Sequence, residues 1–473
     1  MAYFLPFFLY KLYSIKTYFL RIVHMKKTLK IFLAAAVIAA SCIAAPFTAG
    51  AAGARYELPF EPVAESYLLV SLDTGEVVFE KNAHTQRPPA SLTKMLTTYV
   101  AMKYTEDLDA TTVTQTTRHT DELYGMNSST ADIRNGETLT MRQLLYAMML
   151  PSGNEAANMV ADSIGKGSRS NFCMLMNTEA KRMGCTDTNF SNPHGLFSDN
   201  HYTTAWDMYR IAKACYETPG FMDIATTVHY YLPANTRHAD KYLITSTISM
   251  QNKGSPDLYR EYIRGLKTGS TEEAGRNFVT VCEADGESYI LVVMGAPYYR
   301  EDGTQYRTAA FEAAAQIMDY FFDEYSLKPA NGLEAPVTEV ALRYVKDKDN
   351  LLLYPAGEIY SVLPNNVDES AFQKIFNVPE QVYAPINAGD VVGTVSYYIA
   401  GDLVGTTDLI AAESYERDTV IFIVEKIMEI ASSLYFKVVI VVSVVVIAAL
   451  VGFRYWLGKR YEKMQKIHRQ NRR

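Results

Sequence analysis

The chain has 473 residues, 48% of them hydrophobic and 21% charged, which allows about two to four folded domains. Its net charge of −7 hides an asymmetry: residues 1–53 hold six basic residues and no acidic one, residues 454–473 hold eight basic and one acidic, and the body between them carries about −20. An acidic body repels phosphates and excludes nucleic acid as an expected partner, and an anionic substrate would need local positive charge.

Residues 1–54 predict an N-terminal extension followed by a secretory signal peptide. Three lysines follow Met25, residues 31–45 are apolar, and small residues with A-x-A cleavage options run to Ala54. This order is typical of a signal peptide. Residues 1–24 fit no element of a fold, so we expect translation to begin at Met25, with a genuine extension as the alternative.

Residues 55–328 alternate strand-like and helical runs and form the expected catalytic domain. Strands at both ends with helices between them predict an α+β fold, in which a sheet built from both ends packs against a helical cluster. The expected elements are a hairpin over 67–71 and 77–80, helices from 95 to 104 and from 139 to 149, antiparallel strands over 278–282 and 289–294, and a closing helix over 309–325.

The rest of the chain predicts a small β domain and a membrane segment. Short β runs at 339–345, 360–363, 391–398 and 403–409 with turn residues between them indicate an all-β domain over 334–412, after a linker at 329–333. A juxtamembrane stalk or helix at 413–436, a transmembrane helix at 437–457 and a basic tail at 458–473 complete the expected organisation.

The transmembrane prediction depends on the charge that follows the apolar run. Between residues 438 and 453 only Ser443 is polar, and the apolar stretch extends to about twenty residues, enough for one bilayer crossing. The following positive charge marks the cytoplasmic side, so we expect the body to lie outside the cytoplasm. The alternative, a buried core helix, is disfavoured by the terminal position and the basic tail.

Ser91 and Lys94 form the first candidate catalytic pair. A serine hydroxyl needs a base within hydrogen-bond reach to become nucleophilic, and residues i and i+3 of a helix share one face. The pattern S-x-x-K would therefore place an amine beside a hydroxyl. Because the free amine of lysine is scarce at pH 7, Lys94 needs burial or a nearby cation to serve as base, and Lys267 is the candidate cation.

Two further motifs strengthen this interpretation. Ser152 and Asn154 flank Gly153 in a loop after the helix at 139–149, where Ser152 can pass a proton and Asn154 can orient Lys94 and hold a substrate amide. Lys267, Thr268 and Gly269 precede Ser270 on an expected edge strand, where a glycine lets a peptide backbone approach and pair. Lys267 and Thr268 are expected to bind a carboxylate.

Two other groups of residues are given structural interpretations. His194 and His201 lie in a polar loop without a helical ligand pattern, so we expect a structural loop beside the cleft, and neither metal nor cofactor. Cys173, Cys185, Cys215 and Cys282 show no C-x-x-C spacing. Buried free thiols are preferred over disulfides, because a core of this size needs no covalent support.

Together these motifs resemble the D-alanyl-D-alanine carboxypeptidases, penicillin-binding proteins of low molecular mass that carry S-x-x-K, an S-x-N triplet and K-T-G. The resemblance implies a β-lactamase/transpeptidase-like catalytic domain and a small all-β domain. Relatives often end in an amphipathic helix that only lies on the membrane, so the transmembrane helix expected here is not implied by the resemblance. It covers about residues 58–412 and is carried by segments 89–94, 152–157, 192–196, 265–269 and 384–394.

The resemblance also implies partners and roles. The substrate would be a peptidoglycan stem peptide ending in D-Ala-D-Ala, and β-lactams would acylate Ser91. The backbone N–H groups of Ser91 and Ser270 would form an oxyanion hole. An arginine after the last strand often helps to bind the substrate carboxylate in this family; we expect Arg307, with Arg300 as the alternative.

Three alternatives stay open from the sequence. A class A β-lactamase needs a glutamate to activate water, and residues 190–199 hold none, so we expect slow penicillin hydrolysis. An inactive penicillin-binding sensor is disfavoured because all three motifs are intact. A D,D-endopeptidase shares the same motifs and is not separated from a carboxypeptidase by them.

Overall fold

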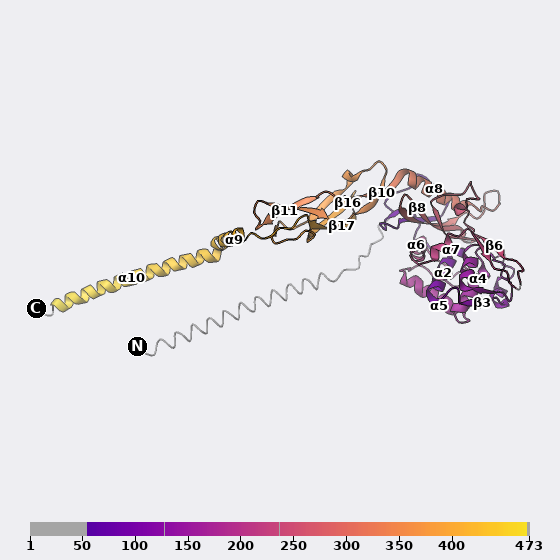
Figure 1. Ribbon diagram of the computed structural model, residues 1–473, viewed down its shortest axis with the longest axis horizontal. Helices are drawn as coiled ribbons and strands as arrows, with labels where there is room; N and C mark the ends of the chain where they lie inside the picture. The colour runs from indigo at the N-terminus through magenta and orange to yellow at the C-terminus, as the bar shows by residue number, and fades with distance from the viewer. Residues whose placement is uncertain (1–53, 127, 236, 471–473) are drawn as a thin grey trace. The chain divides into compact units, whose positions relative to one another are not determined.

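The computed structural model describes residues 54–126, 128–235 and 237–470. The predicted extension and signal peptide therefore lie, apart from residue 54, outside the described residues. From Tyr56 onward the chain forms an α+β domain, a β-rich module and two terminal helices (Figure 1).

The α+β domain is built on a five-stranded antiparallel sheet with strand order β2-β1-β9-β8-β7. The N-terminal hairpin pairs with strands more than 200 residues away, for example Tyr67 with Val293. This confirms the predicted sheet made from both ends of the domain, and it leaves β7 at an edge. The strands are β1 (Ser66–Ser71), β2 (Val77–Lys81), β7 (Ile263–Thr271), β8 (Gly275–Ala284) and β9 (Glu287–Ala296).

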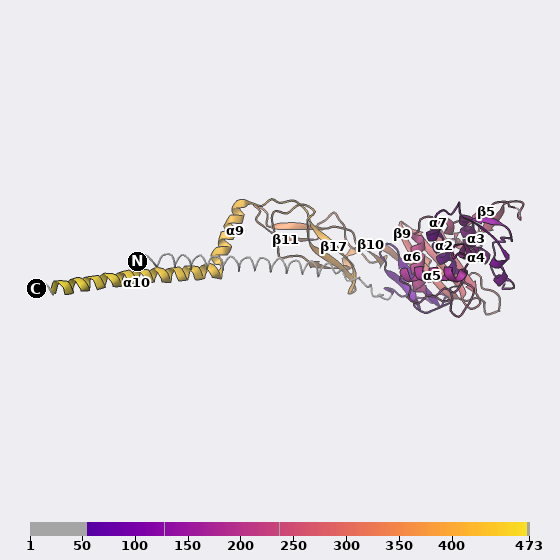
Figure 2. The same ribbon diagram turned by 90° about the horizontal axis from the view of Figure 1, so that it is seen from below.

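The sheet is buried on both faces because its strands present apolar side chains alternately to each side. Leu68 and Val70 enter the core under the helical cluster, whereas Leu69 enters the core under α8 (Ala309–Glu324). Figures 1 and 2 show α2, α4 and α5 grouped together in that cluster. Its helices are α2 (Thr93–Tyr104), α3 (Met141–Met149), α4 (Asn154–Ile164), α5 (Arg169–Arg182), α6 (Ala205–Tyr216) and α7 (Phe221–Ala225).

Short elements connect these helices, and one of them carries Ser91. The 3-10 turn η1 (Ala90–Leu92) leads directly into α2, and α8 closes the opposite face with Phe321 against the rings of Phe79 and Tyr289. Burying one such ring contributes about 1.5–3 kcal/mol. The remaining short elements are β3 (Thr112–Thr114), η2 (Thr117–His119), η3 (Asp121–Leu123), β4 (Thr138–Thr140), β5 (His229–Leu232), β6 (Tyr242–Thr245) and η4 (Ser249–Gln251).

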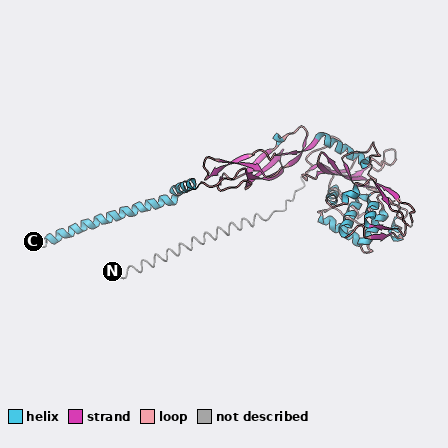
Figure 3. Cartoon of the chain, viewed as in Figure 1, coloured by secondary structure: helices cyan, strands magenta, loops and turns pink. Residues whose placement is uncertain are grey.

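The second module is mainly β, as Figure 3 shows. Its six-stranded sheet has the order β14-β16-β17-β12-β11-β15 around a core that includes Leu351, Leu353 and Tyr397. The strands are β11 (Thr338–Arg343), β12 (Asn350–Pro355), β14 (Gln373–Asn377), β15 (Gln381–Tyr383), β16 (Val391–Ile399) and β17 (Asp402–Ala411), with the 3-10 turn η5 (Glu369–Ala371) before β14.

The expected linker at 329–333 differs from the structure. β10 (Tyr325–Pro329) continues directly from α8 and pairs with β13 (Tyr360–Pro364). Ala330 and Asn331 behind it are buried, and the Asn331 side chain bonds the backbone of Gly357 and Ile359. The polar and glycine-containing sequence looked like a linker because these side-chain-to-backbone bonds cannot be read from residue types.

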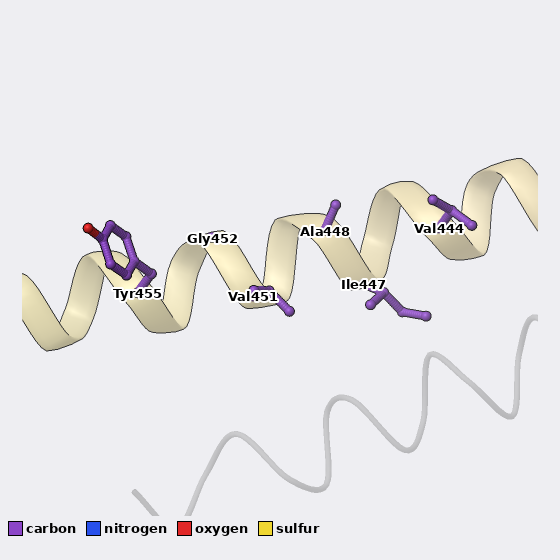
Figure 4. A pocket seen from close by; sticks show the side chains of 6 residues that line it. All are labelled: Val444, Ile447, Ala448, Val451, Gly452 and Tyr455. Atoms are coloured by element: carbon purple, nitrogen blue, oxygen red, sulfur yellow. The ribbon is translucent and has the colours of Figure 1, made fainter.

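Two helices end the chain. In α9 (Thr419–Ser432) the Asp418 side chain caps the first turn by accepting from the N–H groups of Val420 and Ile421. Extended Ser433 separates it from α10 (Leu434–Gln470). Within the described residues, the stretch Leu434–Met464 is long and apolar enough to cross a bilayer. Figure 4 shows the branched side chains of Val444, Ile447 and Val451 projecting from α10, with the small residues Ala448 and Gly452 between them.

The four cysteines of the described chain, Cys173, Cys185, Cys215 and Cys282, are buried and free. This confirms the preference for thiols over disulfides. Burial raises the pKa of each of these thiols, to about 11 for Cys173 and about 12 for Cys185, so they are unreactive at neutral pH. Cys42 lies outside the described residues.

Candidate active site

Ser91 lies at the turn that joins the sheet side of the domain to α2. Ala90 before it is buried and adopts a left-handed conformation with φ of 48°, and the hydroxyl of Thr93 donates to the Ala90 carbonyl at 2.8 Å. These contacts fix the turn, so the Ser91 side chain points into a cleft rather than into the core of α2.

Lys94 is one helical turn away and fully buried, with 0% of its surface exposed. Its Nζ lies 2.8 Å from Oγ of Ser91, and it also bonds Oδ1 of Asn154 at 2.6 Å and the carbonyl oxygen of His194 at 2.7 Å. None of these partners is a carboxylate. The amine is therefore held against the serine by neutral oxygens.

The environment of Lys94 favours its neutral form. Burial lowers the pKa of Lys94 well below its usual range, the charge of Lys267 lowers it further, and Glu155 opposes the shift. An ammonium without a carboxylate partner is costly to bury. The consequence is a larger fraction of free amine near neutral pH, which a proton acceptor for Ser91 requires.

The second motif supplies the opposite wall. Ser152 sits in a left-handed conformation with φ of 67°, and its hydroxyl is buried with no hydrogen-bond partner. Asn154 begins α4, and Glu155 next to it fastens the loop by accepting from the hydroxyl of Thr130 at 2.7 Å and the N–H of Ala131 at 2.6 Å. The unpaired Ser152 hydroxyl is thus available to an incoming group.

The third motif lies on the edge strand β7. Lys267 is fully buried, its Nζ donates to the carbonyl of Thr268 at 3.1 Å, and burial lowers its pKa to about 7. The hydroxyl of Thr268 is 2.7 Å from that of Thr247. A side chain at Gly269 would place Cβ 2.7 Å from the carbonyl oxygen of Pro89, so only glycine lets β7 pass this close to the Ser91 turn.

The three motifs meet in a cleft of about 560 Å³. Of the predicted site residues, Lys94, Asn154 and Lys267 stand behind its wall and Arg300 is not among the lining residues. Those that line it are Ser91, Ser152, Thr268, Gly269, Ser270 and Arg307, together with Ser129, Thr247, Ser249, Leu258, Arg276, Asn277, Tyr298, Gln305, Thr308, Ala310 and Phe311.

Several functional contributors were missed from the sequence. His194 acts on Lys94 through its backbone carbonyl, which no residue letter reveals, and its ring is turned toward Glu122 with Nε2 3.4 Å from Oε1. Thr247 was not recognised as part of the site from the sequence; its hydrogen bond with Thr268 identifies it. Among these residues, only Arg276 could have been noticed in the sequence, because it is a basic residue near the start of the strand that follows the K-T-G motif.

Comparison with known proteins gives consistent results along most of the chain. A family model described as D-alanyl-D-alanine carboxypeptidase matches residues 54–298, and one described as the C-terminal domain of penicillin-binding protein 5 matches residues 335–417. The chain is 27% identical over 355 residues to the D-alanyl-D-alanine carboxypeptidase DacF of Bacillus subtilis, across 75% of this chain and 86% of the relative.

Two further comparisons extend this likeness. The D-alanyl-D-alanine carboxypeptidase DacD of Escherichia coli is 28% identical over 391 residues, across 80% of this chain and 94% of the relative. The structure of penicillin-binding protein 5 from Haemophilus influenzae aligns with a TM-score of 0.57 at 22% identity, across 76% of this chain and 99% of that chain. This last comparison shows a shared fold.

Proposed function

The chain belongs to the D-alanyl-D-alanine carboxypeptidase family, and we propose that Ser91 is its nucleophile and Lys94 the base that activates it. The protein is a serine-type D-Ala-D-Ala carboxypeptidase that acts in peptidoglycan remodelling, as the motif resemblance predicted. The residue assignment rests on one observation, the 2.8 Å separation of the Lys94 amine and the Ser91 hydroxyl inside a site without a carboxylate partner.

Acylation begins when neutral Lys94 accepts the hydroxyl proton of Ser91. Oγ then attacks the carbonyl carbon of the penultimate D-alanine, and the carbonyl oxygen becomes an oxyanion. The backbone N–H groups of Ser91 and Ser270 are the proposed donors to that oxyanion. Removing one such donor in other hydrolases costs on the order of 3–4 kcal/mol of barrier.

The proton must then reach the departing amine. The Ser152 hydroxyl, which is buried and unpaired, gives its proton to the amine of the terminal D-alanine as the C–N bond breaks, and recovers one from the Lys94 ammonium. Asn154 keeps Lys94 oriented through its 2.6 Å bond. Water then attacks the acyl carbon while Lys94 accepts one of its protons, and Lys94 returns that proton to Oγ of Ser91 as the ester bond breaks.

The substrate end is held at the K-T-G strand. The stem peptide pairs with the edge of β7, and its terminal carboxylate lies beside Thr268, near Lys267 and Arg307. β-Lactams carry a carboxylate and an acyl carbon in a comparable relation, so they acylate the same serine. These residue roles are proposed from the geometry of the cleft and from the motifs.

We also propose the organisation around the catalytic domain: residues 55–328 as the catalytic domain, 334–412 as the β domain, 413–436 as a stalk and 437–457 as a membrane-spanning segment. The long apolar helix α10 supports membrane attachment. The positive residues at 458–473 support a cytoplasmic tail and an extracytoplasmic body.

The test uses the full chain in detergent. Wild-type protein is expected to release D-alanine from diacetyl-L-Lys-D-Ala-D-Ala and to be labelled by a fluorescent penicillin, whereas Ser91→Ala does neither. Labelling that survives in Ser91→Ala would remove Ser91 as nucleophile. Ser326→Ala, which alters a hydroxyl that contacts Asn365 and does not line the cleft, is the control and keeps its labelling.

A second measurement separates the related activities. Purified muropeptides are incubated with the enzyme and read by mass: loss of one alanine from pentapeptide stems is expected for the carboxypeptidase. Splitting of cross-linked dimers would show endopeptidase activity, and rapid turnover of penicillin would show a β-lactamase.

A further inference from the structure

Arg276 is a second guanidinium in the cleft that neither the three motifs nor the arginine after the last strand explains. It lies near the start of β8, directly opposite Ser270 on β7. Residues directly opposite on antiparallel strands point to the same face, and the diagonal neighbour, here Thr268, is about 7–8 Å away and within reach of a long side chain. Arg276 therefore belongs to the part of the cleft beside Thr268.

Its surroundings hold the side chain but do not neutralise it. One guanidinium nitrogen donates to the Ser270 hydroxyl, and the group stacks on the ring of Tyr298 with 4.1 Å between Cζ and the ring centroid. Nε and the other terminal nitrogen, Nη2, are buried without a hydrogen-bond partner. Buried N–H groups left unpaired are costly, so an acceptor that bonds them is favoured.

The charge around the cleft points to an anionic acceptor. Arg276 and Arg307 both line it, and the residues that line it include no aspartate or glutamate, although the body of the protein carries about −20. Burial and, to a smaller degree, the charge of Arg307 lower the pKa of Arg276. Two guanidinium groups close together without a carboxylate are stabilised once an anion enters.

Lys267 supplies less positive charge than its place in the motif suggests. Burial lowers its pKa to about 7, so it holds its charge less firmly at neutral pH than an arginine does. An arginine stays charged in proteins at any ordinary pH. A permanent positive charge for the substrate carboxylate must then come from the arginines.

We propose that Arg276 acts with Arg307 as a two-arginine clamp on the terminal carboxylate of the substrate, and so makes the enzyme selective for a free carboxyl end. This inference rests on the proposed function. A change in the side-chain torsions of Arg276 is required to turn its unpaired N–H groups toward a carboxylate oxygen beside Thr268. The same residue then favours stems with a free terminal D-alanine over blocked ones.

The test compares two substrates with four proteins. The substrates are diacetyl-L-Lys-D-Ala-D-Ala and the same peptide ending in D-alaninamide, with kcat/KM followed by mass detection of the released D-alanine or D-alaninamide. We expect Arg276→Gln to lower kcat/KM on the acid by about 10- to 100-fold, the loss typical of a hydrogen bond to a charged group. On the amide the change should be less than about 3-fold, and Arg276→Lys should recover part of the loss on the acid.

Arg300→Gln is the matched control. Arg300 stacks on Tyr306 at the same 4.1 Å but does not line the cleft. The Arg300→Gln substitution should therefore leave kcat/KM unchanged on both substrates. Equal losses on acid and amide in Arg276→Gln would show that Arg276 only positions Ser270, and no loss on either substrate would show that it has no role; both outcomes overturn the clamp. If Arg276→Gln does not fold, Arg276→Lys carries the same comparison.

The two proposals fail in different ways. Wild-type protein that releases no D-alanine would contradict the proposed function. Wild-type protein that is active while Arg276→Gln loses acid and amide turnover equally would contradict the clamp alone.

Discussion

At the scale of single residues, the site combines two buried lysines, and the charge of Lys267 shifts the protonation of Lys94. Lys94 must be neutral to accept the Ser91 proton, whereas Lys267 adds to the attraction of a carboxylate by the arginines only while it is charged. Burial lowers the pKa of both, and Lys267 further lowers that of Lys94. The same burial therefore increases the neutral fraction of Lys94 and decreases the charged fraction of Lys267. The acylation rate is then expected to rise with pH as Lys94 loses its proton and to fall again as Lys267 loses its own.

Removing the charge of Lys267 is expected to shift the rising part of the pH profile of acylation to higher pH. In Lys267→Gln the pKa of Lys94 rises, because a positive neighbour is lost, so less free amine exists at a given acidic pH. The acylation rate constant for a fluorescent penicillin, measured from pH 5 to pH 10, should therefore reach half of its plateau at a higher pH than in wild type. The difference should be greatest below pH about 7, where wild-type Lys267 is charged.

The wild-type descending limb provides the second half of this test. As the pH rises through about 7, Lys267 of the free enzyme loses its proton, and acylation by a carboxylate-bearing penicillin should weaken. Lys253→Gln, a lysine that stacks on Tyr259 outside the cleft, is the control with an unchanged profile. An ascending limb that stays in place in Lys267→Gln contradicts the coupling.

At the scale of elements, catalysis depends on how closely β7 passes the Ser91 turn. Gly269 permits this approach because a Cβ would meet the Pro89 carbonyl oxygen at 2.7 Å and the Leu92 nitrogen at 3.2 Å, both rigid backbone atoms. The Asn277 side chain also joins the two elements by donating to the carbonyls of Pro88 and Pro89. The strand and the nucleophile turn are therefore one fitted unit.

We expect Gly269→Ala to push strand β7 away from the turn that carries Ser91. Displacing reacting groups by about 1 Å can cost on the order of 100-fold in rate, so penicillin acylation should fall by about that factor while the melting temperature changes little. Gly357→Ala is the matched control, since its Cβ meets only the Thr407 hydroxyl at 3.5 Å. Acylation at the wild-type rate in Gly269→Ala would show that the close approach is not needed.

Elements with a strong local pattern could be predicted from the sequence. The hairpin β1–β2, the pair β8–β9 around Asp285 and Gly286, and helix α8 follow from alternation, turn residues and apolar periodicity. Strand β12 was missed because its run of three leucines has no alternation, although their burial does alternate. The hairpin β5–β6 was missed because a long loop separates its strands.

The candidate site was predictable where chemistry resides in side chains of the motifs. Ser91, Lys94 and Asn154 are brought together as the spacing suggested, because a helical turn and a helix N-terminus fix them. The His194 carbonyl could not be predicted, since every residue has one. Arg276 required the cross-strand register with Ser270, which only the paired sheet supplies.

At the scale of the whole molecule, the terminal helices bear on where the enzyme works. The apolar side chains of α9, such as Val420, Ile423 and Ile427, are exposed, and those of α10 are exposed along its apolar stretch. Such surfaces are unfavourable in water and favourable in lipid. The catalytic domain has its own cores on both faces of its sheet and does not depend on these helices.

A chain that ends after residue 417 is therefore expected to leave the membrane fraction and to keep its labelling by penicillin. The full chain should sediment with membranes, and a tag placed after Arg473 should be protected from protease added to intact spheroplasts while the catalytic domain is digested. A truncated chain that still sediments with membranes would show a second attachment. A digested tag in sealed spheroplasts would reverse the proposed orientation.

The length of α10 has a mechanical consequence. Its 37 residues amount to a rod of about 55 Å at 1.5 Å per residue, while the hydrocarbon layer is about 30 Å thick. In the proposed membrane crossing, nearly half of the rod projects beyond the lipid tails, and the sequence places lysines and arginines at its C-terminal end. Anionic lipid headgroups attract these basic side chains. The fraction of anionic lipid in the leaflet that they face would therefore determine the force needed to extract the enzyme from the membrane.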